Sequence, residues 1–467
     1  MTTTARVGRE STEIGRRARL IRRRRGLSLD VVAGLAGFSK GYLSLLETGQ
    51  RGFNRLGLIG DLARALGCSV IDLTGQPYLP VDRDTADALA AVPDIQVALH
   101  NYGPDDVPDV RPRPLDELVA QAQTANDHRD QSRLSLAGRD VGTLITELQV
   151  HASTVASPDR DRAVTALVTA CGVAGPVARV SSGNLDLSAT AGRHALSLAR
   201  RHGNPGLIGF AHWFWASDLS CLGAQDRARD VVATGIDELT PVVQLDTGDT
   251  LPAEMLGMLH LRHGWIAARE RRGDDARAHL DEAGTIAARI GECNGMQRHF
   301  GPTNVRLNRL GIGVELDEGG RAYAEITQAP LDVEALGSRT SSSEMHLDLA
   351  RALAQDGPDR DAEAIRHLDT ADRLAPQRTR MNPVARDLVA DLHRRARHRI
   401  WNSTPCATAS TSAGGVHGTQ TTNHGYAPTS EVVSATCGTS SMSPGSIFRQ
   451  IPSENLTGNE HPAHCIS

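Results

Sequence analysis

Residues 27–49 constrain this chain most, because they have the pattern of two short helices joined by a tight turn. The stretch reads LSLDVVAGLAGFSKGYLSLLETG. Gly37 permits a backbone turn that a residue with a Cβ would resist, and Ser39 is a good N-cap for the second helix. Gly49 stands where a left-handed residue is expected to end that helix. The pattern therefore predicts two helices held at a defined angle.

Each of these two predicted helices has an apolar face. The apolar positions, at helical spacing, are Val31, Val32 and Leu35 in the first helix and Leu43 and Leu46 in the second. The positions left outward at the start of the second helix are Lys40, Gly41 and Ser44. A short helix with a polar front, held at a fixed angle, can enter the major groove of DNA. The stretch therefore predicts a unit that binds double-stranded DNA.

Helical patterns also flank this unit on both sides. Residues 14–25 (IGRRARLIRRRR) place apolar side chains at spacings of four and three, at Ile14, Ala18 and Ile21. Residues 58–66 (LIGDLARAL) predict a following helix closed by Gly67, and residues 70–73 predict a short further turn. We therefore expect an all-α bundle over residues 1–75.

With these flanks, residues 13–75 resemble the Cro/phage-repressor (XRE) class of helix-turn-helix domain. The resemblance implies that Lys40, Gly41 and Ser44 face base edges. It implies a structural pair between Arg22 and Glu47. The full set of residues that it places at the DNA is Lys40, Gly41, Ser44, Ser39, Thr48, Arg22, Arg23 and Arg51.

Two positions depart from the pattern of that class. Leu29 stands where a glutamine that contacts phosphate is common, and Leu45 stands where a polar residue is common. Direct base readout is therefore expected to be sparse. Because arginine and lysine contacts to guanine specify most strongly, Lys40, the sole lysine of the chain, is the main candidate on this helix.

Charge is distributed as a DNA-binding N-terminal unit requires. Residues 1–75 hold thirteen lysines and arginines against six acidic residues, a net charge of +7, whereas the whole chain carries −5. Basic charge thus gathers in the part expected to meet phosphates. The run Arg22–Arg25 by itself is weak evidence, since charge runs are usually solvated faces.

Nothing in the composition points to export, a membrane or a metal. The first residues, MTTTARVGRE, lack the apolar core of a signal peptide, and no run approaches the roughly 20 apolar residues that cross a bilayer. The seven cysteines lack paired short spacing, so a zinc site or disulfide framework is not expected. We expect a reduced, cytoplasmic, nucleoid-associated protein without cofactors.

Residues 76–115 predict a linker rich in proline and aspartate. Four prolines, at positions 104, 108, 112 and 114, would prevent a continuous helix there. The apolar stretch Ala86–Leu99 between the two proline-rich segments predicts one helix that docks on a neighbouring domain.

Residues 116–401 predict an array of helical hairpins. The candidate helices span 187–202, 206–222, 225–239, 253–272, 274–290, 344–355, 360–374 and 384–399. One set of residues recurs at offsets of 12, 4, 3 and 5: Gly264, Ala276, Leu280, Ala283 and Ala288. The other copies are Ala352, Ala364, Leu368, Ala371 and Pro376; Ala216, Ala228, Val232, Gly235 and Thr240; and Leu310, Ala322, Ile326 and Ala329.

These offsets resemble the tetratricopeptide repeat, in which small residues let antiparallel helices approach and a large apolar residue fills the gap to the next hairpin. A helix-turn-helix domain of the XRE class followed by such repeats resembles large regulators of high-GC Gram-positive (actinobacterial) bacteria. It also resembles peptide-responsive regulators of other Gram-positive bacteria. The resemblance implies a sequence-specific transcriptional regulator, a homodimer, whose array binds a signal, peptide or protein, or mediates oligomerisation. The alternative is a protein-interaction scaffold with a degenerate DNA-binding domain, which Leu29 and Leu45 keep open.

Residues 402–467 predict a disordered tail. They are rich in Ser, Thr and Gly, and their only charged residues are Glu431, Arg449, Glu454 and Glu460. A shifted reading frame at the 3′ end of the gene and a genuine low-complexity tail would both explain the abrupt change after Trp401.

Signals for catalysis or metal binding are weak, and we do not expect an enzyme. The triplet Asp246-Thr247-Gly248 is interpreted as a loop, and His260 and His263 lack a nearby third metal ligand. Trp213 and Trp215, in the motif AHWFWA, leave two interpretations open: core packing between hairpins, or a ligand groove lined by tryptophan.

Overall fold

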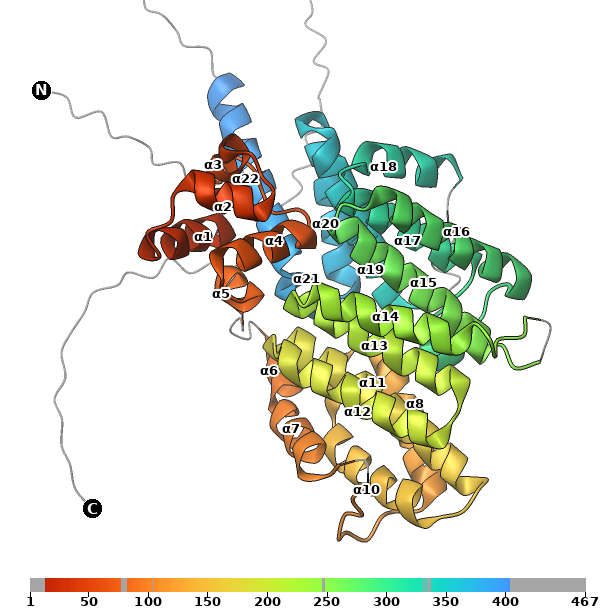
Figure 1. Ribbon diagram of the computed structural model, residues 1–467. Helices are drawn as coiled ribbons and strands as arrows, with labels where there is room; N and C mark the ends of the chain where they lie inside the picture. Colours follow the sequence, from red (N-terminus) through yellow and green to blue (C-terminus); the bar gives the residue numbers. More distant parts are fainter. Residues whose placement is uncertain are drawn as a thin grey trace, which may run out of the picture. The chain divides into compact units, whose positions relative to one another are not determined.

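The computed structural model describes residues 13–76, 82–103, 105–245, 248–329, 331, 333 and 337–403, and the side chains up to residue 396. Within these ranges the chain is helical and contains no strand, which confirms the all-α prediction (Figure 1). Residues up to 398 form one compact unit, and residues 399–467 are assigned to a second. The predicted disordered tail lies outside the described residues from position 404 onward.

The first five helices form the N-terminal bundle. They are α1 (Glu13–Arg24), α2 (Leu29–Ala36), α3 (Lys40–Glu47), α4 (Leu56–Leu66) and α5 (Val70–Thr74). Ile14, Ala18, Leu43 and Leu46 are buried in its core, as their spacing predicts. Gly37 and Gly49 have φ angles of 68°, and Gly67 has 64°, so each takes the left-handed conformation expected of it.

The prediction of which α2 residues face the core is wrong by one position along the helix. Val31 and Leu35 are 48% and 65% exposed, whereas the buried residues are Val32, Ala33 and Ala36. A shift of one residue rotates a helix by about 100°. Alanine allows the closest approach of α2 to its neighbours, so the small side chains face inward and the larger ones remain at the surface.

The segment predicted as a linker contains two helices, α6 (Arg83–Ala90) and α7 (Val92–Asn101). The expectation of one helix over Ala86–Leu99 is therefore wrong. Pro93 stands in the first turn of α7, where its missing N–H costs nothing, and it starts a new helix after Ala91. Ala88, Ile95 and Leu99 are buried in the same apolar core as α8–α16, so these helices dock on the array.

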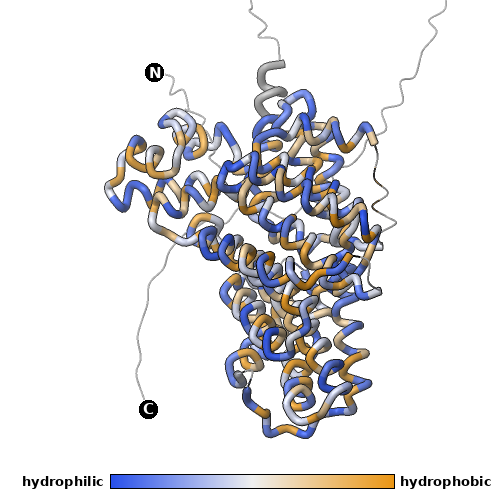
Figure 2. The backbone as a smooth tube through the Cα atoms, turned by 45° about the vertical axis from the view of Figure 1, so that its right-hand side comes forward, coloured by the Kyte–Doolittle hydropathy of each residue, from blue (hydrophilic) through white to orange (hydrophobic). Residues whose placement is uncertain are grey.

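Helices α8–α22 form the array. Their bounds are α8 (Leu115–Asp130), α9 (Leu134–Gly138), α10 (Val141–Thr154), α11 (Asp159–Ser182), α12 (Leu185–His202), α13 (Pro205–Leu222), α14 (Gln225–Leu239), α15 (Leu251–Arg269), α16 (Gly273–Ile290), α17 (Pro302–Glu315), α18 (Gly319–Gln328), α19 (Arg339–Asp356), α20 (Asp361–Leu374), α21 (Pro376–Met381) and α22 (Pro383–Ser403). Among the described residues of the array, the short 3₁₀ turns Gly295–Gln297 and Pro358–Arg360 interrupt the series. Hydrophilic and hydrophobic residues alternate along these helices, as expected for hairpins that bury one face (Figure 2).

Four consecutive hairpins correspond to the four predicted copies of the repeat: α13–α14, α15–α16, α17–α18 and α19–α20. The first four positions are buried in the copies that begin at Ala216, Gly264 and Ala352, but in the copy that begins at Leu310 the fourth position, Ala329, is exposed. A Cβ at Gly264 would stand 3.3 Å from the Ala276 carbonyl oxygen, so the close approach needs glycine. Ala288, at the fifth position, is exposed. The assignment of these hairpins to the tetratricopeptide family stays a prediction.

Helix α11 runs through the middle of the array. By length and composition it is the one straight helix among the described residues that could cross a membrane, yet 83% of its most apolar window is buried inside the protein. It packs on α8, α10 and α12. These contacts explain why α11 is apolar: it is a core helix of the array.

Candidate nucleic-acid interface

The two central helices of the N-terminal bundle are held at a fixed angle. Helices α2 and α3 are bent by 104° relative to each other. Ser28 Oγ accepts the Val31 N–H at 3.2 Å, and Ser39 Oγ accepts the Tyr42 N–H at 3.1 Å, so each helix has a side-chain cap. Left-handed Gly37 makes the turn between them. The angle therefore results from local residues.

A buried ion pair holds the inner side of α3. Arg22 donates from Nε to Glu47 Oε1 at 2.5 Å and from Nη2 to Glu47 Oε2 at 2.7 Å. Its remaining Nη1 donates to the Leu27 carbonyl oxygen at 3.0 Å. The hydrogen bond to Glu47 raises the pKa of Arg22. The structure thus brings together the pair implied by the resemblance, and it commits the Arg22 guanidinium to the fold rather than to a surface that DNA can reach.

The outer side of α3 presents the predicted base-facing residues. Ser39, Lys40 and Gly41 are exposed, while Ser44 is half-buried. Lys40 Nζ lies 2.8 Å from Asp30 Oδ2, and the two side chains are 62% and 63% exposed. Because an exposed ion pair contributes only about 0–1 kcal/mol, a phosphate or a base edge can displace Asp30.

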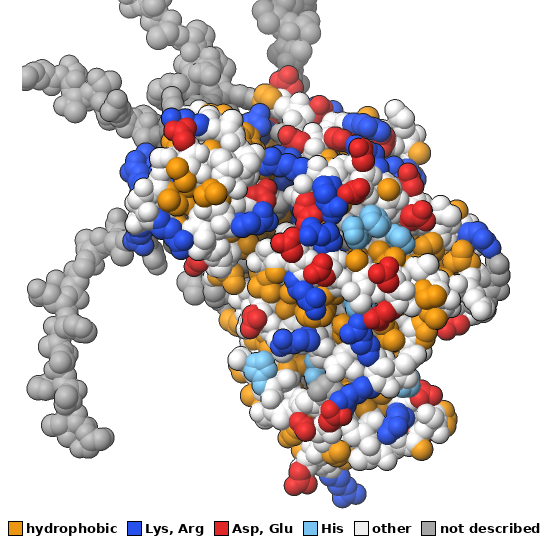
Figure 3. Space-filling model, viewed as in Figure 1, with side chains coloured by type: hydrophobic (Ala, Val, Ile, Leu, Met, Phe, Trp, Pro, Cys, Tyr) orange, Lys and Arg blue, Asp and Glu red, His pale blue; other side chains and the backbone are white. Residues whose placement is uncertain are grey.

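Thr48 and two arginines complete the predicted set. Thr48 Oγ1 donates to the Ser44 carbonyl oxygen at 2.7 Å at the end of α3. Arg23 is exposed, and exposed Arg51 places its guanidinium carbon 5.5 Å from the centre of the Tyr42 ring. Basic side chains lie along the outer edge of the bundle in the face seen in Figure 3. The arrangement leaves Arg23 and Arg51 in positions where phosphates can be contacted.

Residues 13–74 match the family model of a helix-turn-helix domain. These residues form a helix-turn-helix domain. The match spans the described N-terminal bundle up to the end of α5. No curated protein matches the chain.

A solved structure with detectable similarity is that of Bacillus thuringiensis PlcR in complex with the peptide PapR7 and DNA. The match has 13% sequence identity and a TM-score of 0.26, and it covers 60% of this chain and 95% of that chain. A similarity this low assigns neither a ligand nor a function to the array.

The helix-turn-helix domain is held by residues that sequence reasoning missed. Helix α4 has no side-chain cap of its own, because Arg55 stands at its N-cap position. Glu315, from the end of α17, instead accepts the N–H groups of Leu56 and Gly57 at 3.3 and 3.4 Å. The cap thus comes from a residue 259 positions away from Leu56 in the sequence. No local pattern could have indicated it.

Glu315 is itself fixed by Arg351 of α19, whose Nη2 lies 2.6 Å from the Glu315 carboxylate. Burial acts to raise the pKa of Glu315, but Arg351 and Arg269 together with these hydrogen bonds outweigh it and lower the pKa below its usual range. The Glu315 carboxylate is therefore ionised and buried, and Arg351 and Arg269 compensate its charge.

Further contacts connect the array with the loops of the helix-turn-helix domain. Arg351 Nε donates to the Asn54 carbonyl oxygen at 2.9 Å, and Asp387 of α22 accepts the Phe53 N–H. Arg271, just after α15, donates to the Gly37 carbonyl oxygen at 3.0 Å. The array thus contacts the turn before α3 as well as the loop before α4.

The structure separates the two tryptophans, Trp213 and Trp215, for which core packing and a shared ligand groove were both open interpretations. Trp213 lies under the guanidinium carbons of Arg262 and Arg298, at 5.4 and 5.1 Å from its ring centre. Trp215 instead approaches Gly192 of α12, and Arg227 of α14 lies over its ring. Residues two apart on a helix point in nearly opposite directions, so one ligand cannot use both rings in the same way.

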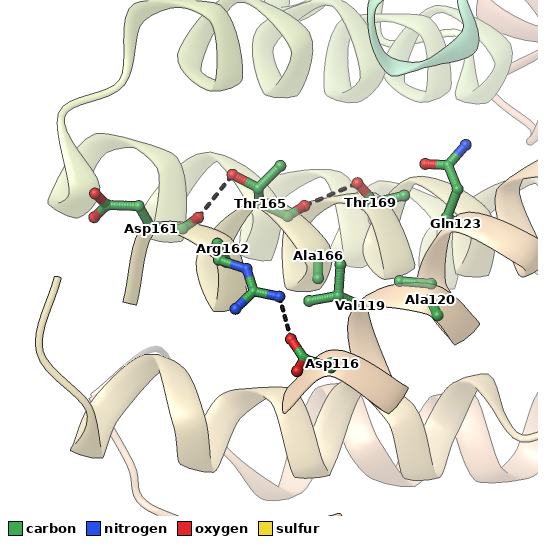
Figure 4. A pocket seen from close by; sticks show the side chains of 10 residues that line it. Asp116, Val119, Ala120, Gln123, Asp161, Arg162, Thr165, Ala166 and Thr169 are labelled. Atoms are coloured by element: carbon green, nitrogen blue, oxygen red, sulfur yellow. Dashed lines mark hydrogen bonds and ion pairs between the residues drawn. The ribbon is translucent and has the colours of Figure 1, made fainter. Parts of the chain in front are cut away.

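A pocket of about 590 Å³ lies between α8 and α11 (Figure 4). Arg162 and Asp116 form an ion pair between the two helices there. The hydroxyls of Thr165 and Thr169 donate to carbonyls of their own helix. The complete lining is Asp116, Val119, Ala120, Ala122, Gln123, Asp161, Arg162, Thr165, Ala166 and Thr169. Small and apolar side chains thus dominate this pocket.

The histidines considered as metal ligands meet a third histidine. His260 Nδ1 lies 2.9 Å from His279 Nδ1, and the rings of His263 and His279 stack with centres 3.8 Å apart. In the part of the chain that the structure describes, no group of three or more His, Cys, Asp or Glu side chains is arranged to hold a metal ion. Asp246 and Thr247 of the loop triplet lie outside the described residues.

Proposed function

We propose that this protein is a sequence-specific, DNA-binding transcriptional regulator whose helical array binds a signal, peptide or protein partner. The observation that carries the proposal is the helix-turn-helix domain with α3 anchored from behind by Arg22 and Glu47. That anchor leaves exposed Lys40 and Gly41 at the start of α3, the end that meets base edges in domains of this type.

The contacts between the array and the helix-turn-helix domain support a regulatory role for the array. The array contacts this domain at Gly37, Phe53, Asn54, Leu56 and Gly57. A ligand that repacks the hairpins would shift these contacts and with them the helix that reads DNA. Such coupling requires the ligand to bind one arrangement of the array more tightly than another.

The proposal has corollaries for partners and location. Double-stranded DNA is the main partner, and we propose a homodimer because paired domains of this type read paired half-sites. A DNA-binding regulator works in the cytoplasm, at the nucleoid. The role is not enzymatic and requires no cofactor.

Selection of bound sequences from random double-stranded DNA by the full chain tests the proposal. Enrichment of a discrete motif, lost in the Lys40→Ala variant, is expected. Enrichment of no motif by a folded protein would overturn it and would favour the alternative, a helical scaffold whose N-terminal domain has lost specific DNA binding. Leucines at positions 29 and 45, both half-buried, are the observation behind that alternative.

A further inference from the structure

Five arginines from separate elements come together inside the array. We call Arg129 of α8, Arg179 of α11, Arg262 of α15, Arg298 and Arg378 of α21 the inner arginine cluster. Arg298 interacts electrostatically with Arg129 and Arg378, and Arg179 with Arg262 and Arg378. Because like charges repel, other interactions in the fold must offset the repulsion between these guanidinium groups.

Two members of the inner arginine cluster lack an anionic partner. Arg262 and Arg298 both lie over the Trp213 ring, and Arg298 also lies 5.0 Å from the centre of the Phe210 ring. Neither side chain makes a hydrogen bond or ion pair to any described residue, and the Nε of each is buried without a partner. Their donors are therefore available to a bound molecule.

The other three members have protein partners. Arg378 Nη1 donates to Glu344 at 2.6 Å, and Arg179 Nε lies 3.3 Å from Asp218. Arg129 Nε donates to the neutral Asn126 side chain at 2.8 Å. The Nε atoms of Arg179 and Arg378 are also buried without a hydrogen bond, so Arg262 and Arg298 differ from them in having no ion pair either.

Positive charge exceeds negative charge around the cluster. Five guanidinium groups face four nearby carboxylates, those of Asp127, Asp130, Asp218 and Glu344. Burial lowers the pKa of Arg262 to about 10, so its guanidinium remains charged at neutral pH while it is poorly solvated. Arg262 and Arg298 are half-buried, a charge without a partner in such a place is costly, and a bound anion would reduce that cost.

The face of α11 that lines the pocket continues along the helix to Gly172, which packs against Phe210 next to Arg298. Arg162, Ala166, Thr169 and Gly172 succeed one another at intervals of three or four residues, which places them on one side of the helix. A Cβ at Gly172 would lie 3.5 Å from Arg298 Nη2.

We propose that the inner arginine cluster binds an oxyanion, a carboxylate or a phosphate, of the ligand that the array recognises, with Arg262 and Arg298 as donors and Trp213 as their platform. The planar guanidinium group can donate two parallel hydrogen bonds to either a carboxylate or a phosphate. Cation–π contact with the Trp213 ring restricts the guanidinium groups of Arg262 and Arg298 before the ligand binds. This inference rests on the proposed function only in assuming that the array has a ligand.

Titration of the full chain with citrate and, separately, with pyrophosphate tests the proposal, with sodium chloride used to keep the ionic strength constant. Binding is followed by calorimetry and by tryptophan fluorescence. Saturable binding of citrate would assign a carboxylate and saturable binding of pyrophosphate a phosphate, and either result supports the proposal. Binding of neither anion beyond the chloride control would overturn it.

Variants distinguish this site from other basic surfaces. Arg298→Ala and Arg262→Ala should each weaken anion binding at least tenfold, and Arg298→Lys should weaken it less because the charge is kept while the fork is lost. Arg193→Ala, on the exposed face of α12, is the matched control and should bind as the wild type does. Unchanged binding in folded Arg298→Ala and Arg262→Ala would overturn the proposal.

DNA binding, measured on the same samples, separates the two proposals. Loss of a DNA motif with intact anion binding would reject the regulator and spare the cluster. Selection of a DNA motif by a protein that binds neither anion would reject the anion site in the cluster and spare the regulator.

Discussion

Glu315 and Arg351 form a buried ion pair of 2.6 Å that also caps α4 of the helix-turn-helix domain. The carboxylate thus has two functions at once, because it neutralises an enclosed guanidinium and accepts two N–H groups at the start of a helix. Removing it would leave the two N–H groups without their cap and Arg351 with Asp348 as its remaining carboxylate partner. The pair is therefore the contact through which the array and the DNA-binding domain most directly stabilise each other.

The Glu315→Gln substitution should lower the free energy of unfolding by about 1–3 kcal/mol, because buried Arg351 loses one of its two carboxylate partners and keeps only Asp348. Denaturant unfolding measures the loss. The double variant Glu315→Gln/Arg351→Met should lose less than the sum of the two single variants. Additive losses would show that the two side chains do not stabilise the fold as a pair.

Arg22 and Arg23 are adjacent, but they should behave differently. Arg22→Met leaves Glu47 buried and unpaired, so the free energy of unfolding should fall by about 3–5 kcal/mol. Exposed Arg23→Ala should change stability by less than about 0.5 kcal/mol, and it should weaken binding to all DNA sequences alike. Thermal unfolding and DNA titration over a salt series measure the two effects. Equal stability of the two variants would contradict the buried pair.

Lys40→Ala should reduce discrimination at one base pair by about 1–3 kcal/mol, because a lysine contact to guanine is lost there. The ion pair with Asp30 is exposed, so stability should change little. Binding to a panel of single-base variants of the selected motif measures the effect. The Asp30→Asn variant is the control for loss of the ion pair itself. The same specificity profile with and without Lys40 would remove this residue from base readout.

Gly264→Leu should destabilise the array by about 1–3 kcal/mol, because the hairpin has no room for a side chain between α15 and α16. A Cβ there would already lie 3.1 Å from Ile312 Cδ1. Ala288→Leu, at an exposed position of the same predicted repeat, is the matched control and should be neutral within about 0.5 kcal/mol. Equal melting temperatures for both variants would show that the contact at Gly264 is not tight.

Acid should weaken the fold through buried histidines. Burial lowers the pKa of His194 to about 4, with Arg201 adding to the effect. Between pH 6.5 and 4 the unfolded chain therefore takes up a proton that the folded chain does not, so the free energy of unfolding falls as the pH falls. His194→Gln should make that fall shallower, by up to about 1.4 kcal/mol per pH unit. Exposed His100→Gln controls for the chemical change, and an unaltered slope in His194→Gln would refute this role.

Local features were predictable because their causes lie within a few residues. The caps Ser28 and Ser39 act on N–H groups three positions away, and Gly37 makes its turn alone. The helix-turn-helix domain could therefore be predicted from the sequence with nearly correct helix bounds. The hairpin contact of Gly264 with Ala276 was predictable for a similar reason, since a fixed offset of 12 places small residues opposite each other.

Positions that depend on how elements pack were not predictable. The rotation of α2, which exposes Val31 and buries Ala33, depends on which side chain allows closest approach. Trp213 and Trp215 diverge because they lie on opposite sides of α13, and only the stacked hairpins show which side meets Arg298. The sequence pattern indicated aromatic residues at this place without indicating their direction.

The amino-acid sequence by itself thus determined the helices, their caps, the order of the hairpins and the basic character of the DNA-binding domain, because each depends on short-range pattern or on composition. Only the tertiary structure decided that Glu315 caps α4 and that five arginines meet inside the array. Glu315 and Leu56 are 259 positions apart, and the arginines that interact with one another are 80 or more positions apart. Their geometry depends on small rotations added over successive hairpins, which no local pattern encodes.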